Sequence, residues 1–229
     1  MEIKLDSRLN AIYNYIRENR IIADIGTDHG YLPIYALQNK KASFAFCCDV
    51  NPMPLQNAVN LINQFSMQKQ TKAVISNGLE NLKENCCDDI IIAGMGFDLI
   101  INILSSCKWI KNKDINLILQ PMTGHENVRK YLFENNYKIS DETAVFDENK
   151  IYTIICCHYD EKPILFNEVD LFLGSHLRKA KKGDSLSKKY INTIVKKLEN
   201  IVLGLEKSKN KNDEIEKTKN LIIKIKNEI

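Results

Sequence analysis

The first strand-like run of the chain leads into Ala23-Asp24-Ile25-Gly26-Thr27-Asp28-His29-Gly30, and a helix-like stretch over Tyr31–Gln38 follows. A glycine turn between a strand and a helix lets the backbone pass close to a ligand at the helix N-terminus. A turn of this kind can serve several nucleotide ligands, so on its own it is a weak signal. We expect Asp24, Gly26 and Gly30 to bind a nucleotide-like cofactor.

The charge of this turn narrows the choice of cofactor. A dinucleotide would bring its pyrophosphate to the carboxylate of Asp28, and two negative charges at one place repel each other. A ligand with a cationic end suits an acidic turn better, and S-adenosylmethionine carries both an ammonium and a sulfonium group. The turn therefore favours methyl transfer, with Asp28 among the cofactor-binding residues.

Strand-like and helix-like runs alternate through the first 160 residues. Strands are expected at 21–25, 44–49, 72–76, 89–93, 115–120, 137–145 and 151–158, and helices at 7–17, 31–38, 54–65, 79–84, 98–107 and 126–135. Such alternation predicts βαβ units on a parallel sheet. The last two strands have no helix between them, and Asp147-Glu148-Asn149 indicates an antiparallel turn. We expect an α/β fold of the class I methyltransferase (Rossmann-like) type, a seven-stranded, mostly parallel sheet with an antiparallel final hairpin.

A different pattern begins after Pro163. From Leu186 to Leu205 apolar residues recur at steps of three and four, which is the stripe of an amphipathic helix. A shorter helix is expected at 171–177 before it, and a second long helix, which includes 215–225, is expected after a polar break at 208–213. We therefore divide the chain into a cofactor-binding catalytic domain, 1–160, and a coiled-coil-like α-helical hairpin, 161–229.

The charges of the chain are distributed unevenly between these two regions. Residues 1–160 carry 16 basic and 19 acidic side chains, whereas residues 161–229 carry 16 and 10. A basic module beside an acidic one suggests a polyanionic partner that one module holds and the other processes. A lysine-rich, solvated helix surface would give the same balance, so charge alone leaves both interpretations open.

Composition and cysteine usage indicate a cytoplasmic protein. No apolar run approaches a membrane span, and the N-terminus has no secretory pattern. Six of the seven cysteines form adjacent pairs, namely Cys47-Cys48, Cys86-Cys87 and Cys156-Cys157, and Cys107 stands alone. Adjacent cysteines lack zinc-site spacing, and an odd number argues against a disulfide framework. We expect reduced, packed thiols, no metal and no membrane association.

Further cofactor contacts are expected after the second, third and fourth strands. Asp49 ends the second strand, where a carboxylate can bind ribose hydroxyls or serve only as a turn residue. Asn77-Gly78 follows the third strand, either as an adenine-contacting loop or as a simple turn. Gly94-Met95 follows the fourth strand and would let the backbone approach a flat base. Phe97 is either a stacking surface or the first packed residue of the next helix.

Together these segments resemble the bacterial tRNA (adenine-22-N1)-methyltransferases over nearly the full chain. The matching residues are Arg8-Leu9, Ala23 to Pro33, Pro54, Ala58, Gly78-Leu79, Ala93 to Gly96, Ile118 to Pro121, Arg129, Leu132, Glu142, Tyr152 and the basic helical hairpin. The block Asp24-Ile25-Gly26-Thr27-Asp28-His29-Gly30-Tyr31-Leu32-Pro33 is the most specific of them. Three positions depart from the family pattern: Phe97 replaces a glycine, Asn77 an acidic residue and Met122 an asparagine.

The resemblance implies methylation of N1 of an adenine in the tRNA D-arm, with S-adenosylmethionine as cofactor and no metal. Asp28, His29 and Tyr31 are then the candidate catalytic residues, with Asp28 stabilising the positive charge of the product ring. The competing interpretations are Asp28 as a helix N-cap and His29 as a packed turn residue. The helical hairpin would hold tRNA phosphates, and we expect the protein to act as a monomer.

Two other functions are compatible with the same sequence. A methyltransferase of this fold could act on a protein or a small molecule, with the C-terminal helices serving dimerisation. A non-catalytic RNA-binding protein could retain a degenerate nucleotide fold. Steep salt dependence of tRNA binding distinguishes the leading hypothesis from the first alternative, and cofactor binding distinguishes it from the second.

Overall fold

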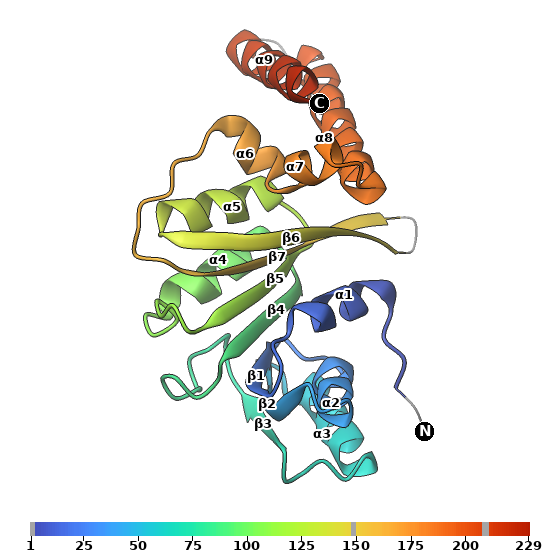
Figure 1. Cartoon of the computed structure of the whole chain (residues 1–229), viewed down its shortest axis with the longest axis vertical. Coiled ribbons are helices and arrows are strands. Elements are labelled where there is room, and N and C mark those ends of the chain that lie inside the picture. Colours follow the sequence, from blue (N-terminus) through green and yellow to red (C-terminus); the bar gives the residue numbers. More distant parts are fainter. Residues whose placement is uncertain (1–2, 148–149, 208–210) are drawn as a thin grey trace.

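One sheet of seven strands lies at the centre of the computed structural model, which describes residues 3–147, 150–207 and 211–229 (Figure 1). The strands stand in the order β3-β2-β1-β4-β5-β7-β6. Their bounds are β1 Arg20–Ile25, β2 Ala42–Asp49, β3 Thr71–Ile75, β4 Asp89–Met95, β5 Asn116–Pro121, β6 Tyr137–Asp147 and β7 Lys150–Tyr159. Strands β1 to β5 pair in parallel, and β7 runs antiparallel to both β5 and β6. The expected Rossmann-like sheet with a final antiparallel hairpin is confirmed.

Helices cover both faces of this sheet. They are α1 Ser7–Tyr15, α2 Tyr31–Gln38, α3 Pro52–Gln64, α4 Phe97–Ser106 and α5 His125–Glu134. The side chains of β4 show which helices cover which face. Ile90 and Ile92 pack with α4 and α5 on one face, whereas Ile91 packs with α1 and α2 on the other. Alternate residues of a strand point to opposite faces, so a strand buried on both faces is apolar throughout.

The first helix is shorter than the expected range 7–17 and ends at Tyr15. Arg17 leaves the helix because it is bound to the buried carboxylate of Asp89. Its backbone N–H and its Nε both lie 2.7 Å from Asp89 oxygens. The end of α1 is thus decided by a contact with β4.

The helix expected at 79–84 is wrong, since the chain forms successive turns there. Gly78 has φ +59°, and the hydroxyl of Ser76 accepts from the backbone N–H of Asn81 at 3.1 Å. The Asn81 side chain in turn donates to the Ile75 carbonyl at 2.8 Å. Local side-chain hydrogen bonds of this kind compete with helix formation.

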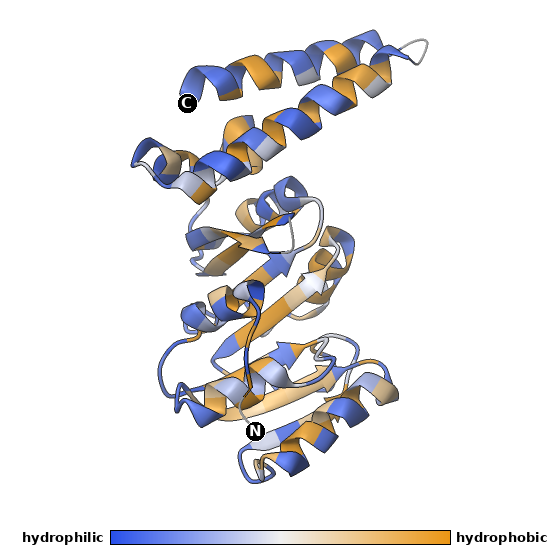
Figure 2. Cartoon of the chain, turned by 90° about the vertical axis from the view of Figure 1, so that its right-hand side faces the viewer, coloured by the Kyte–Doolittle hydropathy of each residue, from blue (hydrophilic) through white to orange (hydrophobic). Residues whose placement is uncertain are grey.

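The C-terminal region begins with two short helices, α6 Glu168–Leu173 and α7 His176–Lys181, where one helix at 171–177 was expected. The expectation is wrong because Gly174 breaks the helix with φ +52° and ψ −141°. The long helices α8 Ser185–Glu206 and α9 Asn212–Glu228 follow. Buried apolar residues of both helices pack in one cluster, and the ion pairs Lys219–Glu206 and Lys226–Glu199 show that the helices run antiparallel. Figure 2 shows this hairpin at one end of the molecule.

Two expected connections lie partly outside the described residues, namely 148–149 of the β6–β7 turn and 208–210 of the polar break. Within the described part of the chain, none of the helices combines the length and apolar character needed to cross a membrane. The seven cysteines are free, and all except the half-buried Cys86 are buried. They therefore serve as packing residues.

Candidate active site

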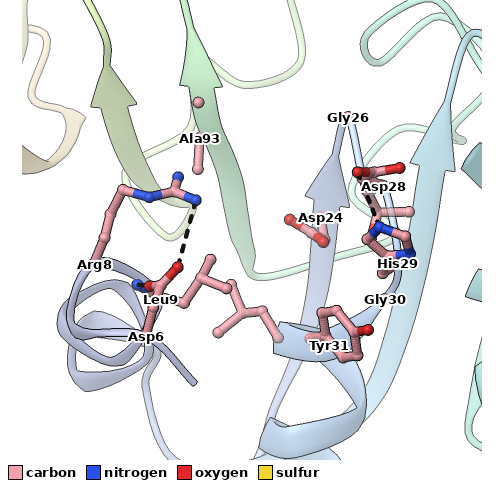
Figure 3. Close-up of a pocket in the computed structure, with 13 residues that line it drawn as sticks. Asp6, Arg8, Leu9, Asp24, Gly26, Asp28, His29, Gly30, Tyr31 and Ala93 are labelled. Atoms are coloured by element: carbon pink, nitrogen blue, oxygen red, sulfur yellow. Dashed lines mark hydrogen bonds and ion pairs between the residues drawn. The ribbon is translucent and has the colours of Figure 1, made fainter. Parts of the chain in front are cut away.

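A cavity of about 400 Å³ opens at the carboxyl ends of β1 and β4 (Figure 3). One wall comes from the start of α1, and the opposite wall comes from the β1–α2 turn and the first turn of α2. Of the residues predicted from the sequence, Asp24, Gly26, Asp28, His29, Gly30, Tyr31 and Gly94 line this cavity. The parallel sheet explains the position, because ligands in such folds bind beyond the carboxyl ends of the strands.

Asp24 is the buried charge of the cavity. It lies near the end of β1 and is only 9% exposed. Burial raises the pKa of its carboxyl from 3.8 to about 6, although the nearby Arg8 guanidinium opposes the shift. A carboxylate that is removed from water gains strongly from a cationic partner. Asp24 is therefore suited to bind an ammonium group.

The turn after Asp24 depends on two left-handed glycines. Gly26 has φ +77°, and a Cβ at this position would lie 2.3 Å from the Met95 methyl group. Gly30 has φ +73° and is the N-cap of α2, without a side-chain capping bond. The alternative that Asp28 caps this helix is consequently wrong. The two glycines thus let the turn pack closely against Met95 and Ala58 at the edge of the cavity.

Asp28, His29 and Tyr31 form a polar and aromatic rim. A carboxylate oxygen of Asp28 lies 3.2 Å from Nε2 of His29, and the side chains are 70% and 47% exposed. The rings of His29 and Tyr31 lie 5.3 Å apart, centroid to centroid. His29 is thus not a packed turn residue, and all three side chains are accessible to a substrate.

Arg8 and Gln120 are site residues that the sequence reasoning did not assign. Nη1 of Arg8 donates to Oε1 of Gln120 at 2.9 Å, and the same oxygen accepts from the backbone N–H of Gly94 at 3.1 Å. The side chain of Gln120 is fully buried and holds Arg8 at the cavity wall. Both residues belong to the family-like blocks, but 112 positions separate them, so only the fold reveals their contact.

Four predicted cofactor residues are not part of the cavity lining, namely Asp49, Asn77, Gly78 and Met95. The carboxylate of Asp49 accepts from the backbone N–H of Asn51 at 2.7 Å, as a turn residue would. The Asn77 amide donates to Glu80 at 2.9 Å. Asp49 still contributes to the raised pKa of Asp24, which places it near the cavity. The cofactor roles of these four residues stay predictions.

Phe97 packs inside the protein and does not face the cavity. Its ring is half-buried against the main core, and a Cβ at Gly124 would lie 2.3 Å from Cδ1 of Phe97. Met122 is 41% exposed, and its sulfur lies 3.5 Å from the Gln120 amide nitrogen. Of the two interpretations of Phe97, the geometry favours the packed helix residue.

Comparison of the sequence with known proteins identifies methyltransferases as its relatives. A family model described as "Methyltransferase domain" matches residues 5–155. The tRNA (adenine(22)-N(1))-methyltransferase of Bacillus subtilis (strain 168) is 32% identical over 173 residues, which cover 76% of this chain and 73% of that protein.

Solved structures extend the similarity over the whole chain. The B. subtilis M1A22 tRNA methyltransferase TrmK superposes with a TM-score of 0.83 at 25% identity, covering 98% of this chain and 99% of that one. M. capricolum TrmK, solved in complex with S-adenosyl-homocysteine, superposes with a TM-score of 0.81 at 30% identity, covering 97% and 96%. The chain therefore belongs to the TrmK-like family of tRNA (adenine(22)-N(1))-methyltransferases.

Proposed function

We propose that this methyltransferase transfers the methyl group of S-adenosylmethionine to N1 of adenine 22 in the D-arm of tRNA. The similarity to the B. subtilis enzyme of that name, at 32% identity over three quarters of the chain, carries the proposal. The surplus of basic residues in 161–229 supports a polyanionic substrate. Since the proposed substrate is tRNA, we place the reaction in the cytoplasm.

S-adenosylmethionine is the cofactor, and the side chains of the cavity fit it. Its amino-acid end is a zwitterion, and the cavity offers an anion in Asp24 and a cation in Arg8 on the opposite wall. The buried Thr27 hydroxyl interacts with the Asp24 carboxyl and lowers its pKa, so it helps to keep this group ionised for the ligand. Gly26, Gly30 and Gly94 line the same cavity and present backbone to it.

Methyl transfer to adenine N1 requires alignment of the two reactants more than it requires acid–base catalysis. The bound cofactor supplies an electrophilic methyl group, and adenine N1 has a free lone pair at neutral pH. The protein therefore has to hold N1 in line with that group, and alignment alone can lower a barrier substantially. Tyr31, 45% exposed at the rim, offers a flat surface for the base. The Asp28 carboxylate beside it would stabilise the positive charge that develops on the ring.

We propose separate roles for the two parts of the chain. Residues 1–160 would bind the cofactor and methylate, and residues 161–229 would bind tRNA phosphates. The lysines of the second part differ in their availability. Lys219, Lys224 and Lys226 are paired with Glu206, Glu168 and Glu199. Lys182 and Lys188 are exposed and have no ion-pair partner in the described part of the chain, so they are free to bind phosphates.

The decisive test is incubation of the protein with methyl-labelled S-adenosylmethionine and unmodified tRNA, followed by nucleoside analysis. We expect 1-methyladenosine with tRNA that carries adenine 22 and none with a transcript that carries guanine there. Label in protein or in small molecules, with no 1-methyladenosine in tRNA, would contradict the proposal.

Cofactor binding is expected to weaken as the pH falls below about 6. The pKa of Asp24 is about 6 in the free protein, so the carboxyl is ionised above this pH and protonated below it. An ammonium group binds only the ionised form, so affinity should fall by up to about tenfold for each pH unit below the pKa. Titration calorimetry with S-adenosylhomocysteine between about pH 5 and 7 measures this. Asp24→Asn should bind weakly at every pH, and an affinity of the unaltered protein that does not change over this range would oppose the assignment.

Replacing Lys182 and Lys188 together by alanine is expected to weaken tRNA binding and flatten its salt dependence. Each lost phosphate contact should reduce the slope of log affinity against log salt by about 0.7–0.9. Lys226→Ala is the matched control, because Glu199 neutralises that lysine at 2.8 Å. Fluorescence anisotropy across a salt series gives both slopes, and an unchanged tRNA affinity of the double variant would remove this role.

A further inference from the structure

A fully buried ion pair lies between the catalytic domain and the C-terminal helices. Nε of Arg129 on α5 is 2.7 Å from Oε1 of Glu142 on β6, and both side chains are 0% exposed. Burial by itself would raise the pKa of Glu142, but the Arg129 guanidinium holds it below its ordinary value. The pair is therefore charged, and neither the cofactor cavity nor the proposed chemistry uses it.

The remaining hydrogen bonds of the pair go to the C-terminal helices. Arg129 donates through Nη1 to the carbonyls of Leu171 and Phe172, at 2.8 and 3.0 Å. Its Nη2 donates to the hydroxyl of Tyr190 on α8 at 3.1 Å. Oε2 of Glu142 accepts from the backbone N–H of Ser175 at 2.5 Å. One ion pair of the catalytic domain thus binds α6, the α6–α7 connection and α8.

The chain passes so close to this pair that only glycine fits at position 174. A Cβ there would lie 2.0 Å from Oε2 of Glu142 and 2.6 Å from Nε of Arg129. The left-handed φ of +52° at Gly174 disfavours any other residue as well. The break between α6 and α7 is therefore shaped around the ion pair.

Neighbouring polar contacts strengthen the same junction. Nε2 of the buried His176 lies 2.8 Å from Oγ1 of Thr153 on β7, and its Nδ1 lies 3.1 Å from the Ser187 hydroxyl on α8. Lys179 on α7 pairs with Asp141 at 2.8 Å, and Asp141 also accepts from the Tyr15 hydroxyl at 2.9 Å. Tyr15 ends α1, the helix that begins at the cofactor cavity.

We propose that Arg129 and Glu142 are positioning residues, which hold the helical hairpin in one orientation relative to the cofactor cavity. Purely apolar contacts tolerate small shifts, whereas directional bonds to a buried charge do not, because a shift leaves the charge without partners. Two binding surfaces held at a fixed spacing capture one substrate more tightly than two loosely joined ones. The inference rests on the proposed binding of tRNA by both parts of the chain.

The test is the double variant R129M/E142L, which replaces the pair by apolar side chains. Removing both partners of a buried pair is often tolerated, so the variant should fold. We expect a larger radius of gyration by small-angle X-ray scattering and a KM for tRNA raised by about tenfold or more. The kcat and the affinity for S-adenosylhomocysteine should stay within about threefold, because the cavity is untouched. K130M/E134L is the matched control, since it removes an exposed pair of the same helix.

The outcomes separate the two proposals. If the unaltered protein does not methylate tRNA, the proposed function fails, and scattering alone still decides whether the pair fixes the orientation. An unchanged radius of gyration together with an unchanged KM overturns the positioning role. Equal losses in tRNA and cofactor binding overturn it too, because they indicate general damage to the fold. If the double variant does not fold, Y190F provides the same readouts, since it keeps the ion pair and removes only the α8 hydroxyl that accepts from Arg129.

Discussion

Asp24→Asn is expected to weaken S-adenosylmethionine binding by about thirtyfold or more. Asp24 is buried at the cavity, and its charge is unfavourable there until a cation arrives. Removing one partner of a buried, hydrogen-bonded charge pair costs about 2–5 kcal/mol, and about 1.4 kcal/mol corresponds to a factor of ten. Isothermal titration calorimetry measures the affinity directly.

The same variant should make the free protein more stable. The folded-state pKa of about 6 lies above the ordinary value of 3.8, so the ionised carboxyl destabilises the fold at neutral pH and this cost disappears below pH 3.8. An asparagine carries no such cost, so the midpoint of thermal unfolding at pH 7 should rise while cofactor affinity falls. Asp98→Asn, at an exposed acid in the first turn of α4, is the control; it should leave the affinity unchanged and should lower stability slightly, by at most about 1 kcal/mol, because it loses a favourable interaction with the helix dipole. A variant that loses affinity and stability together would point to misfolding instead of a lost ligand contact.

Arg129→Met as a single substitution is expected to lower the free energy of unfolding by about 3–5 kcal/mol. It leaves the Glu142 carboxylate buried without its cation, and it removes the donors to two carbonyls and to Tyr190. At pH values above the ordinary pKa of Glu142, the full loss of stability is expected. In the unaltered protein the folded-state pKa of Glu142 lies below its ordinary value, so the stabilisation that the ion pair provides is lost as the pH falls and the carboxyl becomes protonated. The difference in stability between the variant and the unaltered protein therefore shrinks at low pH. Urea unfolding at two pH values measures both effects.

The control for this prediction is Lys130→Met on the same helix. Lys130 is 55% exposed and lies 3.9 Å from Glu134, so its loss should change stability by less than about 1 kcal/mol. The double variant R129M/E142L should be more stable than Arg129→Met alone, since it buries no unpaired charge. A single variant as stable as Lys130→Met would show that the buried pair contributes nothing to folding.

Much of the fold could be predicted because the deciding signals are local. Apolar runs of four to eight residues gave the strands, and the apolar steps of α8 gave the long helix. The failures occurred where a distant group intervened. Arg17 leaves α1 for Asp89 on β4, and the α6–α7 region breaks at Gly174 around an ion pair formed by two other elements. The turns at 79–84 are the exception, because their competing hydrogen bonds are local.

By itself the sequence determined the sheet with its final hairpin and the acidic glycine turn after β1, along with the division of charge between the two parts of the chain. Periodicity, glycine and charge act over a few residues, so they can be recognised without coordinates. Only the tertiary structure decided that Arg8 and Gln120 meet at the cavity, and that Arg129 and Glu142 hold the C-terminal helices. These contacts join residues 112 and 61 positions apart, from Arg8 to Gln120 and from Arg129 to Tyr190. Their partners are chosen by the packing of whole elements, and no local pattern encodes that choice.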